Sequence, residues 1–446
     1  MMTTAHPPAS LTQRSLLRLM TCGSVDDGKS TLIGRLLHDT KLVFEDQLAA
    51  VEKASRRRGD ERIDLALLTD GLRAEREQGI TIDIAYRYFA TPARKFILAD
   101  APGHAQYTRN MATAASSAEL AIVLVDARHG VIEQTRRHTV VAATLGVRHI
   151  LVAVNKMDLV GFDASRFEAV KRAYLDFAAE VDALGSAELS FIPISALEGD
   201  NVVERSPRMP WYTGTAVLEA LETVTVRRPA DTTPFRMPVQ WVIRPQADGF
   251  EDYRAVAGRV AAGRLAAGDE VVVLPGGQRT SVASITLGEH DLPEARRGQS
   301  IAVVLADDID APRGVTLAAA EADLPHTGRD VVADLVWMSD RPLAAGSRWL
   351  LKHASVSAQV VVEQVHDALD VSTGRRSRFE EDAGRLELNG IGRVALRSSA
   401  PLVFDAYTKC RGTGGLILID PRTGQTVAIG TIHGPGSDVE EQEYAI

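Results

Sequence analysis

Short apolar runs alternate with helical stretches along the first half of the chain. Five runs end in polar clusters: "LLRLMTCG", "KFILAD", "AELAIVLVDA", "HILVAVNKMD" and "LSFIPISAL". Continuous apolar runs of this kind are typical of strands buried on both faces of a sheet. Helical patterns occupy the segments between them, at 30–38, 105–117, 133–145, 164–184 and 213–224. Alternating strands and helices predict an α/β domain with a mostly parallel sheet, whose ligand lies at the carboxyl ends of the strands.

The pattern changes at the segment "VRRPADTTPFRMP", whose prolines and charges are typical of a linker. Short strands separated by glycine turns follow it, and the pattern restarts near "PHTGRDVVADLVWM". Strand signals about every 8–12 residues favour small barrels or sandwiches. We therefore expect an α/β domain over 1–230 and two small all-β barrel domains over 234–325 and 326–446.

Composition changes this picture little but excludes some functions. The formal net charge of -9 argues against a protein that mainly coats nucleic acid. The two cysteines, Cys22 and Cys410, form no CxxC pair, so neither a zinc site nor a disulfide framework is indicated. No signal-peptide pattern and no apolar run of membrane-spanning length is present. We expect a soluble cytoplasmic protein without nucleic-acid or membrane partners.

The first chemical motif is "GSVDDGKS", which matches G-x-x-x-x-G-K-[ST] between a predicted strand and a predicted helix. Gly23 and Gly28 allow the backbone amides to close around phosphate groups. Lys29 can bridge the β- and γ-phosphates, and Ser30 can offer its hydroxyl to Mg²⁺. A chance match in a glycine turn is the alternative, and the strand–loop–helix context argues against it.

Two further motifs complete the predicted phosphate side. "DAPGH" follows the run "KFIL", which places Asp100 where a carboxylate can reach Mg²⁺ through water. Gly103 leaves an amide free to approach a γ-phosphate, and His104 could position an attacking water. "GITID" supplies Thr81, which can sense Mg²⁺ and the γ-phosphate as part of a first switch. Each motif is weak alone, because turns and solvated charged segments look similar.

The base is predicted by "NKMD" and "SAL". Asp158 can accept hydrogen bonds from guanine N1–H and its exocyclic amine, donors that adenine lacks. Asn155 can tie the loops together, and the stem of Lys156 can cover one face of the base. The turn at Ser195, Ala196 and Leu197 can present the amide of its central residue to guanine O6. An Asx turn and an ordinary helix start are the alternatives.

These motifs occur in the order expected of a P-loop GTPase domain, and with the two β domains they resemble the translational GTPases such as elongation factor Tu. Within that superfamily the chain resembles the GTPase subunit of bacterial sulfate adenylyltransferase (ATP sulfurylase). Ser24 and Asp27 stand where elongation factor Tu usually has histidines. The resemblance covers residues 15 to about 433 and includes the segments "HGVIEQTRRH", "SALEGDNVVERSPRMPWYTG", "DLVWMSDRPLAAGSRWLLKH" and "ELNGIGRVAL".

The resemblance implies a GTPase that couples GTP hydrolysis to formation of adenosine 5′-phosphosulfate from ATP and sulfate by a small catalytic partner subunit, in a heterodimer or a higher assembly. It implies catalytic roles for Lys29, Thr81 and His104, and Mg²⁺ binding by Ser30, Thr81 and Asp100. The base residues carry over as Asn155, Lys156, Asp158, Ser195, Ala196 and Leu197. Nucleotide phosphates carry over to Gly103 and to Gly23, Ser24, Val25, Asp26, Asp27, Gly28, Lys29, Ser30 and Thr31.

Three expectations remain open at this point. Asp26 could help to bind a monovalent cation, as the resemblance suggests. Some relatives carry a fused adenylylsulfate kinase, but we expect none here, because the chain has no second G-x-x-x-x-G-K-[ST] match. The competing functions are a translation factor that delivers aminoacyl-tRNA and a GTP-binding regulatory module without coupled chemistry. The acidic balance mildly disfavours tRNA delivery, which needs a basic surface.

Overall fold

The computed structural model describes residues 15–40, 65, 83–103, 108–226, 229–245, 253–380 and 383–436. The chain divides into two compact units. The N-terminal unit comprises Met1–Val226 with Val371–Gly374, and the C-terminal unit comprises Arg227–Asp370 with Arg375–Ile446.

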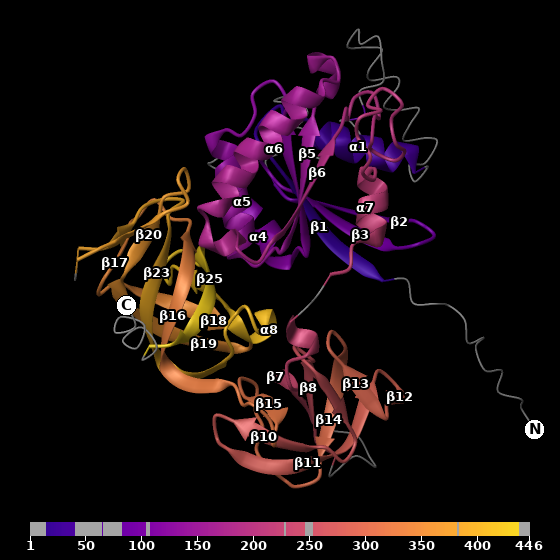
Figure 1. Cartoon of the computed structure of the whole chain (residues 1–446). Coiled ribbons are helices and arrows are strands. Elements are labelled where there is room, and N and C mark those ends of the chain that lie inside the picture. The colour runs from indigo at the N-terminus through magenta and orange to yellow at the C-terminus, as the bar shows by residue number, and fades with distance from the viewer. Residues whose placement is uncertain are drawn as a thin grey trace, which may run out of the picture. The chain divides into compact units, whose positions relative to one another are not determined.

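The N-terminal unit is built on a six-stranded sheet with the order β2-β3-β1-β4-β5-β6 (Figure 1). Strand β2 runs antiparallel to β3, and the pairs β1–β3, β1–β4, β4–β5 and β5–β6 are parallel. This confirms the predicted mostly parallel sheet. The strands are β1 (Leu16–Cys22), β2 (Ala85–Ala90), β3 (Lys95–Asp100), β4 (Leu120–Asp126), β5 (His149–Asn155) and β6 (Glu188–Pro193).

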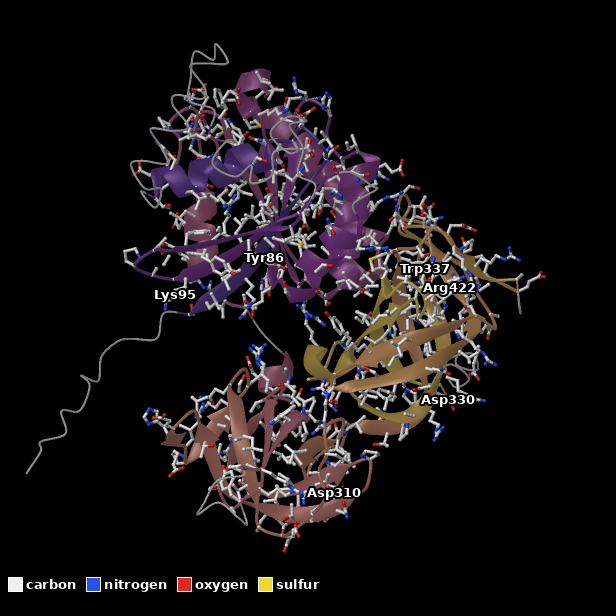
Figure 2. All side chains as sticks on the ribbon, turned by 180° about the vertical axis from the view of Figure 1, so that it is seen from behind. Tyr86, Lys95, Asp310, Asp330, Trp337 and Arg422 are labelled. Carbon is white, nitrogen blue, oxygen red and sulfur yellow. The ribbon has the colours of Figure 1, made fainter. Side chains whose placement is uncertain are left out.

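Strand β2 was not predicted, because it lacks a continuous apolar run. It lies at one edge of the sheet, where Tyr86 and Tyr88 are exposed. Figure 2 labels Tyr86 on this strand and Lys95 at the start of the neighbouring strand β3. An edge strand that buries only part of its length gives a weaker apolar signal than the central β4 and β5, which are buried along their whole length.

Helices cover both faces of this sheet. Helices α1 and α7 lie on one side, and α4, α5 and α6 lie on the other (Figure 1). Leu32 and Leu36 of α1 and Leu221 of α7 pack in one core cluster with Leu19 and Leu98 of the sheet. The helices are α1 (Lys29–Asp39), α4 (Thr108–Ser117), α5 (Glu133–Thr144), α6 (Ala164–Ala179) and α7 (Val217–Thr223).

The C-terminal unit contains two closed barrels of six strands each, as predicted from the strand spacing. The first has the order β10-β15-β7-β8-β14-β11 and closes through the β10–β11 pairing. Closure leaves none of these six strands as a free edge. Its strands are β7 (Arg236–Ile243), β8 (Ala255–Arg259), β10 (Glu270–Leu274), β11 (Gln278–Leu287), β14 (Ser300–Leu305) and β15 (Thr316–Ala319), accompanied by β9 (Arg264–Ala266), β12 (His290–Asp291) and β13 (Glu294–Arg296).

The second barrel has the order β16-β25-β24-β18-β19-β23 and closes through the β16–β23 pairing. Its core is centred on Trp337 and Trp349, whose ring centroids lie 5.1 Å apart in an edge-to-face arrangement. Trp337 is labelled in Figure 2. The strands are β16 (His326–Trp337), β18 (Arg348–His353), β19 (Val356–Val365), β23 (Ile391–Phe404), β24 (Gly415–Ile419) and β25 (Thr426–Pro435), with β17 (Leu343–Ala344), β20 (Asp367–Leu369), β21 (Arg376–Arg378), β22 (Arg385–Leu386) and α8 (Arg411–Gly414).

Candidate functional site

The glycine-rich loop joins β1 to α1 and makes a tight turn. Gly28 is the N-cap of α1 with a left-handed φ of 93°, and no side chain caps the helix. Among the described residues, no side chain accepts from the first amides of α1, which makes this end of the helix suited to an anion. A Cβ placed on Gly28 would lie 2.4 Å from Nδ2 of Asn155, so this position requires glycine. Ser30 and Thr31 follow in the first helical turn, both partly buried.

The lysine of the loop folds back over it. The buried Nζ of Lys29 donates to the carbonyl oxygens of Ser24 at 2.8 Å and Gly23 at 3.2 Å. Burial lowers the pKa of the Lys29 ammonium, and the nearby carboxylates of Asp100 and Asp27 oppose that shift. The ammonium thus lies inside the loop, where a polyphosphate could accept its hydrogen bonds.

The two adjacent aspartates of the loop have different environments. Asp27 is only 4% exposed, and its carboxylate accepts a 2.6 Å hydrogen bond from the backbone amide of Ser24. Burial raises the pKa of Asp27, and the bond from Ser24 and the charge of Lys29 oppose that shift. Asp26 is exposed and left-handed, with φ of 66°, and Val25 before it is partly buried. The Asp27 carboxylate therefore holds the backbone of the loop through its hydrogen bond with the Ser24 amide.

The turn after β3 lies directly against this loop. Asp100 is buried at the end of β3 and accepts a 3.0 Å hydrogen bond from the hydroxyl of Thr21. A Cβ placed on Gly103 would lie 2.7 Å from Nζ of Lys29 and 2.9 Å from the carbonyl oxygen of Gly23. Glycine at 103 therefore lets the backbone approach the lysine closely. The predicted site residues Thr81 and His104 lie outside the described residues.

A single asparagine connects three loops of the site. Asn155 ends β5 and is 2% exposed. Its Nδ2 donates to the carbonyl oxygen of Asp27 at 2.7 Å, and its Oδ1 accepts from the amide of Ala196 at 2.9 Å. The amide expected to face a guanine O6 is thus already bonded to Asn155, so a base at this position would have to share or replace that bond.

Asp158 has the chemistry that a guanine requires. It lies in the short 3-10 helix η3 (Met157–Val160) and is partly buried. Within the part of the chain that the structure describes, its carboxylate accepts no hydrogen bond and forms no ion pair. The two carboxylate oxygens at this edge of the sheet can accept from two neighbouring N–H donors on one ligand.

The loop of Ser195, Ala196 and Leu197 is held in place by Arg35, a residue outside the sequence motifs. Arg35 of α1 donates to the carbonyl oxygen of Ala196 at 3.3 Å and also to that of Leu197. Ser195 is buried, and its hydroxyl accepts from the amide of Glu198 at 3.2 Å. The side chain of Leu197 is half exposed. The backbone of this loop is therefore fixed to the same helix that begins at the phosphate loop.

Sequence reasoning also missed Asp126, the last residue of β4. It is 2% exposed and lies 3.0 Å from Nζ of Lys156, while Arg128 donates to it from its backbone amide and its guanidinium. Burial alone would raise the pKa of Asp126, but the bonds from Arg128 and Lys156 outweigh burial and hold it below its usual range. The available signal was the same as for Asp100, an aspartate that ends an apolar strand.

The segment that follows the Ser195 loop packs against the residues that follow Asp158. Arg208 forms an ion pair with Asp200, its Nε donating at 2.9 Å, and its guanidinium lies 4.7 Å from the centroid of the Phe162 ring. Trp211 donates from Nε1 to the carbonyl oxygen of Phe162 at 2.9 Å. The two loops that bear Asp158 and Ser195 are therefore fastened to each other outside the predicted base position.

The donor set fits a hard cation bound together with phosphates. No group of three or more His, Cys, Asp or Glu side chains able to hold a metal occurs in the described ranges. Mg²⁺ commonly uses one or two protein oxygens plus substrate phosphates and waters, and Ser30 and Asp100 could supply such oxygens beside Lys29.

None of the described helices is long and apolar enough to cross a membrane.

Comparison with known proteins gives consistent matches. A family model of the elongation factor Tu GTP binding domain matches residues 14–227, and a model described as GTP-eEF1A C-terminal domain-like matches residues 330–433. The chain is 49% identical over 424 residues to sulfate adenylyltransferase subunit 1 of Citrobacter koseri, covering 95% of this chain and 87% of that protein.

Solved structures of sup35 are also similar. The complex with GMPPNP has a TM-score of 0.42 at 23% identity and covers 95% of this chain and 94% of the sup35 chain. The complex with GDP has the same TM-score and identity and covers 96% and 97%.

Proposed function

Because the chain belongs to the sulfate adenylyltransferase subunit 1 family, we propose that it binds and hydrolyses GTP and couples hydrolysis to formation of adenosine 5′-phosphosulfate from ATP and sulfate. The adenylylation itself takes place on a small catalytic partner subunit. The 49% identity over 95% of the chain does not support the alternative of a translation factor that delivers aminoacyl-tRNA.

One observation carries the nucleotide part of this proposal: Asn155 is bonded both to the phosphate loop at Asp27 and to the loop of Ala196. Lys29 lies in the first of these loops. The carboxylate of Asp158, which bonds to no described residue, lies three residues beyond Asn155. A ligand with a polyphosphate at one end and two adjacent N–H donors at the other matches this arrangement. GTP has both features, whereas ATP lacks the second.

The remaining roles follow from chemistry at named atoms. Ser30, Thr81 and Asp100 would hold Mg²⁺, which supplies charge neutralisation at the β- and γ-phosphates when bound. Lys29 donates to the same phosphates, and Gly103 offers its backbone amide to the γ-phosphate. His104 orients the attacking water, and Ser195 and Leu197 shape the turn that faces the base.

The proposal extends to organisation and location. We divide the chain into a GTPase domain over 1–230 and barrel domains over 234–325 and 326–446. The chain and its partner subunit form a heterodimer or a higher assembly. The protein works in the cytoplasm, without nucleic-acid or membrane partners. Two free, buried cysteines, Cys22 and Cys410, suit a reducing compartment.

The test is GTP turnover by the complex with the small subunit. We expect ATP plus sulfate to stimulate GTP hydrolysis and GTP to increase the yield of adenosine 5′-phosphosulfate. Lys29→Ala is the control: it should remove GTP turnover, and with it the GTP-dependent increase in adenosine 5′-phosphosulfate. If ATP and sulfate leave GTP turnover unchanged in the assembled complex, coupling is wrong and a regulatory GTP-binding module is the better reading. Tight GTP-dependent binding of aminoacyl-tRNA would support the translation factor instead.

A further inference from the structure

We propose that Asp126 is a positioning residue of the base site, which holds Lys156 in the orientation that covers one face of the guanine. The inference rests on the proposed GTP function and deepens it by adding a residue outside the five sequence motifs. It is carried by the position of Asp126, by its burial and by the number of its hydrogen bonds.

Strand pairing places the carboxylate beside the base loop. Strands β4 and β5 are parallel neighbours, and Asp126 is in register with Asn155. Lys156 is therefore the next residue after the partner of Asp126, at the same edge of the sheet. Its backbone is left-handed, with φ of 64°, which is unusual for a lysine and turns the chain sharply after β5.

The ion pair is well suited to fix a long side chain. Nζ of Lys156 lies 3.0 Å from Oδ2 of Asp126, and this is the only ion pair of Lys156 with any described residue. The other hydrogen bonds of the carboxylate come from Arg128, whose amide and Nε reach Oδ1 at 2.9 and 3.0 Å and whose Nη2 reaches Oδ2 at 2.7 Å. The exposed ring of His129 lies farther away, with Nδ1 3.7 Å from Oδ2. A carboxylate held this firmly loses little further freedom when it binds a lysine, so the pair is stronger than a mobile surface pair.

The turn that carries Asp126 has other supports, so its charge is not needed to fold it. The amide of Ala127 donates to the carbonyl oxygen of Asn155 at 2.9 Å. Arg166 of α6 donates to the carbonyl oxygens of Ala127 and Arg128, both at 2.8 Å. Asp126→Asn should therefore preserve the backbone, because the amide oxygen can still accept from Arg128, while the ion pair with Lys156 is lost.

The expected effect is a loss of affinity that does not depend on the γ-phosphate or on recognition by Asp158. We expect Asp126→Asn to weaken GTP and GDP binding by the same factor, on the order of tenfold, because the partner Lys156 is partly exposed and keeps some solvation. Inosine triphosphate lacks the exocyclic amine read by Asp158 but offers a similar ring face. Its binding should fall by the same factor, so the ratio of GTP to inosine triphosphate affinity should stay constant.

The experiment is a double-mutant cycle in the full chain, with fluorescent guanine and inosine nucleotides as probes. Asp126→Asn, Lys156→Met and the double variant should show equal losses, because either change removes the same pair. Asp163→Asn is the matched control: Asp163 also accepts hydrogen bonds from a residue two positions later, Ser165, but at the start of α6. Its variant should bind nucleotide as the wild type does.

The outcomes separate the two levels of inference. If the wild type does not bind GTP, the proposed function fails. If the wild type binds GTP but Asp126→Asn or Lys156→Met binds within twofold of it, the positioning role is overturned. Additive losses in the double variant, or a changed ratio between GTP and inosine triphosphate, would also overturn it. Should Asp126→Asn fail to fold, Lys156→Met still overturns the role if it binds GTP within twofold of the wild type, since Asp126 remains bonded to Arg128 in that variant.

Discussion

The phosphate loop and the base loops of the N-terminal unit are built in different ways. The phosphate loop depends on backbone shape: Gly28 and Gly103 leave no room for a side chain, and the lysine bonds to carbonyl oxygens within the loop. The base loops depend on side chains that reach across the sequence, such as Asn155 to Asp27 and Arg35 to Leu197.

This difference predicts two kinds of sensitivity. A single substitution in the backbone-built loop should cause a large loss of GTP affinity, because an added Cβ overlaps atoms that are already held by hydrogen bonds. A loop held by several side chains weakens in steps, since each contact contributes about 1 kcal/mol and the others remain. Substitutions at the two ends of the site should therefore differ in size, and the following variants test that.

Gly28→Ala should have the largest effect. The left-handed conformation costs alanine about 1–2 kcal/mol, and the new Cβ would displace the Asn155 amide that bonds to Asp27. Together we expect a loss of roughly 3 kcal/mol or more, which is at least about 100-fold in GTP affinity measured by titration. Gly130→Ala is the control, because Gly130 is also left-handed, at φ 73°, but has nothing within 4 Å. Equal losses in both variants would contradict the steric argument.

Asn155→Ala should have the next largest effect. It removes two buried hydrogen bonds and leaves their partners unpaired, at about 1–3 kcal/mol each, so we expect roughly a 30-fold loss of GTP affinity and a lower Tm. Asn201→Ala is closely matched, because Asn201 is equally buried and bonds one carbonyl oxygen, of Pro193, and one amide, of Ser206. It should lower Tm similarly but keep most of the affinity. If both variants lose affinity equally, Asn155 acts only through stability.

The same contrast explains how much the sequence could predict. The phosphate loop and the parallel sheet were predictable because their signals are local: glycine spacing, and apolar runs that end at polar residues. Turn spacing favoured small barrels or sandwiches, and both regions close as six-stranded barrels. Strand β2 was missed because its exposed tyrosines interrupt any apolar run.

The supports of the base site were not predictable for a different reason. Arg35 acts through a partner that only folding brings near, because the carbonyl oxygen of Ala196 lies more than a hundred residues away along the chain. Nothing in the spacing of an arginine along a helix states which distant carbonyl it will reach. The bond between Ala196 and Asn155 likewise emerges only when β5 and β6 pair.

His138 offers a test of the phosphate end through pH. Gln134 donates to the carbonyl oxygen of Gly103 at 2.8 Å and lies 3.3 Å from Nε2 of His138, whose Nδ1 has no hydrogen-bond partner among the described residues. Burial, together with the smaller effect of the positive charges of Lys29 and Arg137, lowers the pKa of His138 to about 3. In the unfolded chain the His138 imidazole has an ordinary pKa near 6.5. It therefore binds a proton there at pH values at which it stays neutral in the folded chain.

A lowered pKa in the folded state makes the protein less stable as the pH falls. The contribution of His138 to stability is fully present above about pH 6.5 and is lost as pH falls from there toward 3. Between pH 7.5 and 5.5 this single group should reduce the free energy of unfolding by about 1.4 kcal/mol. In His138→Gln, denaturant titrations at the two pH values should show a drop smaller by that amount. An unchanged pH dependence would mean that His138 is protonated in the folded state.

Arg208→Ala should have the smallest effect, although it removes three contacts at once. Arg208 is 43% exposed, so the ion pairs with Asp200 and Glu198 and the contact with the Phe162 ring are screened by solvent and together contribute about 1 kcal/mol or less. We expect GTP and GDP to dissociate up to about fivefold faster in stopped-flow displacement, with little change in Tm. Arg148→Ala is the control: Arg148 bonds the Ser186 hydroxyl at the opposite end of β5 and should leave dissociation unchanged. A loss as large as that of Gly28→Ala would show that the base loops also fail abruptly, and the contrast between the two ends of the site would not hold.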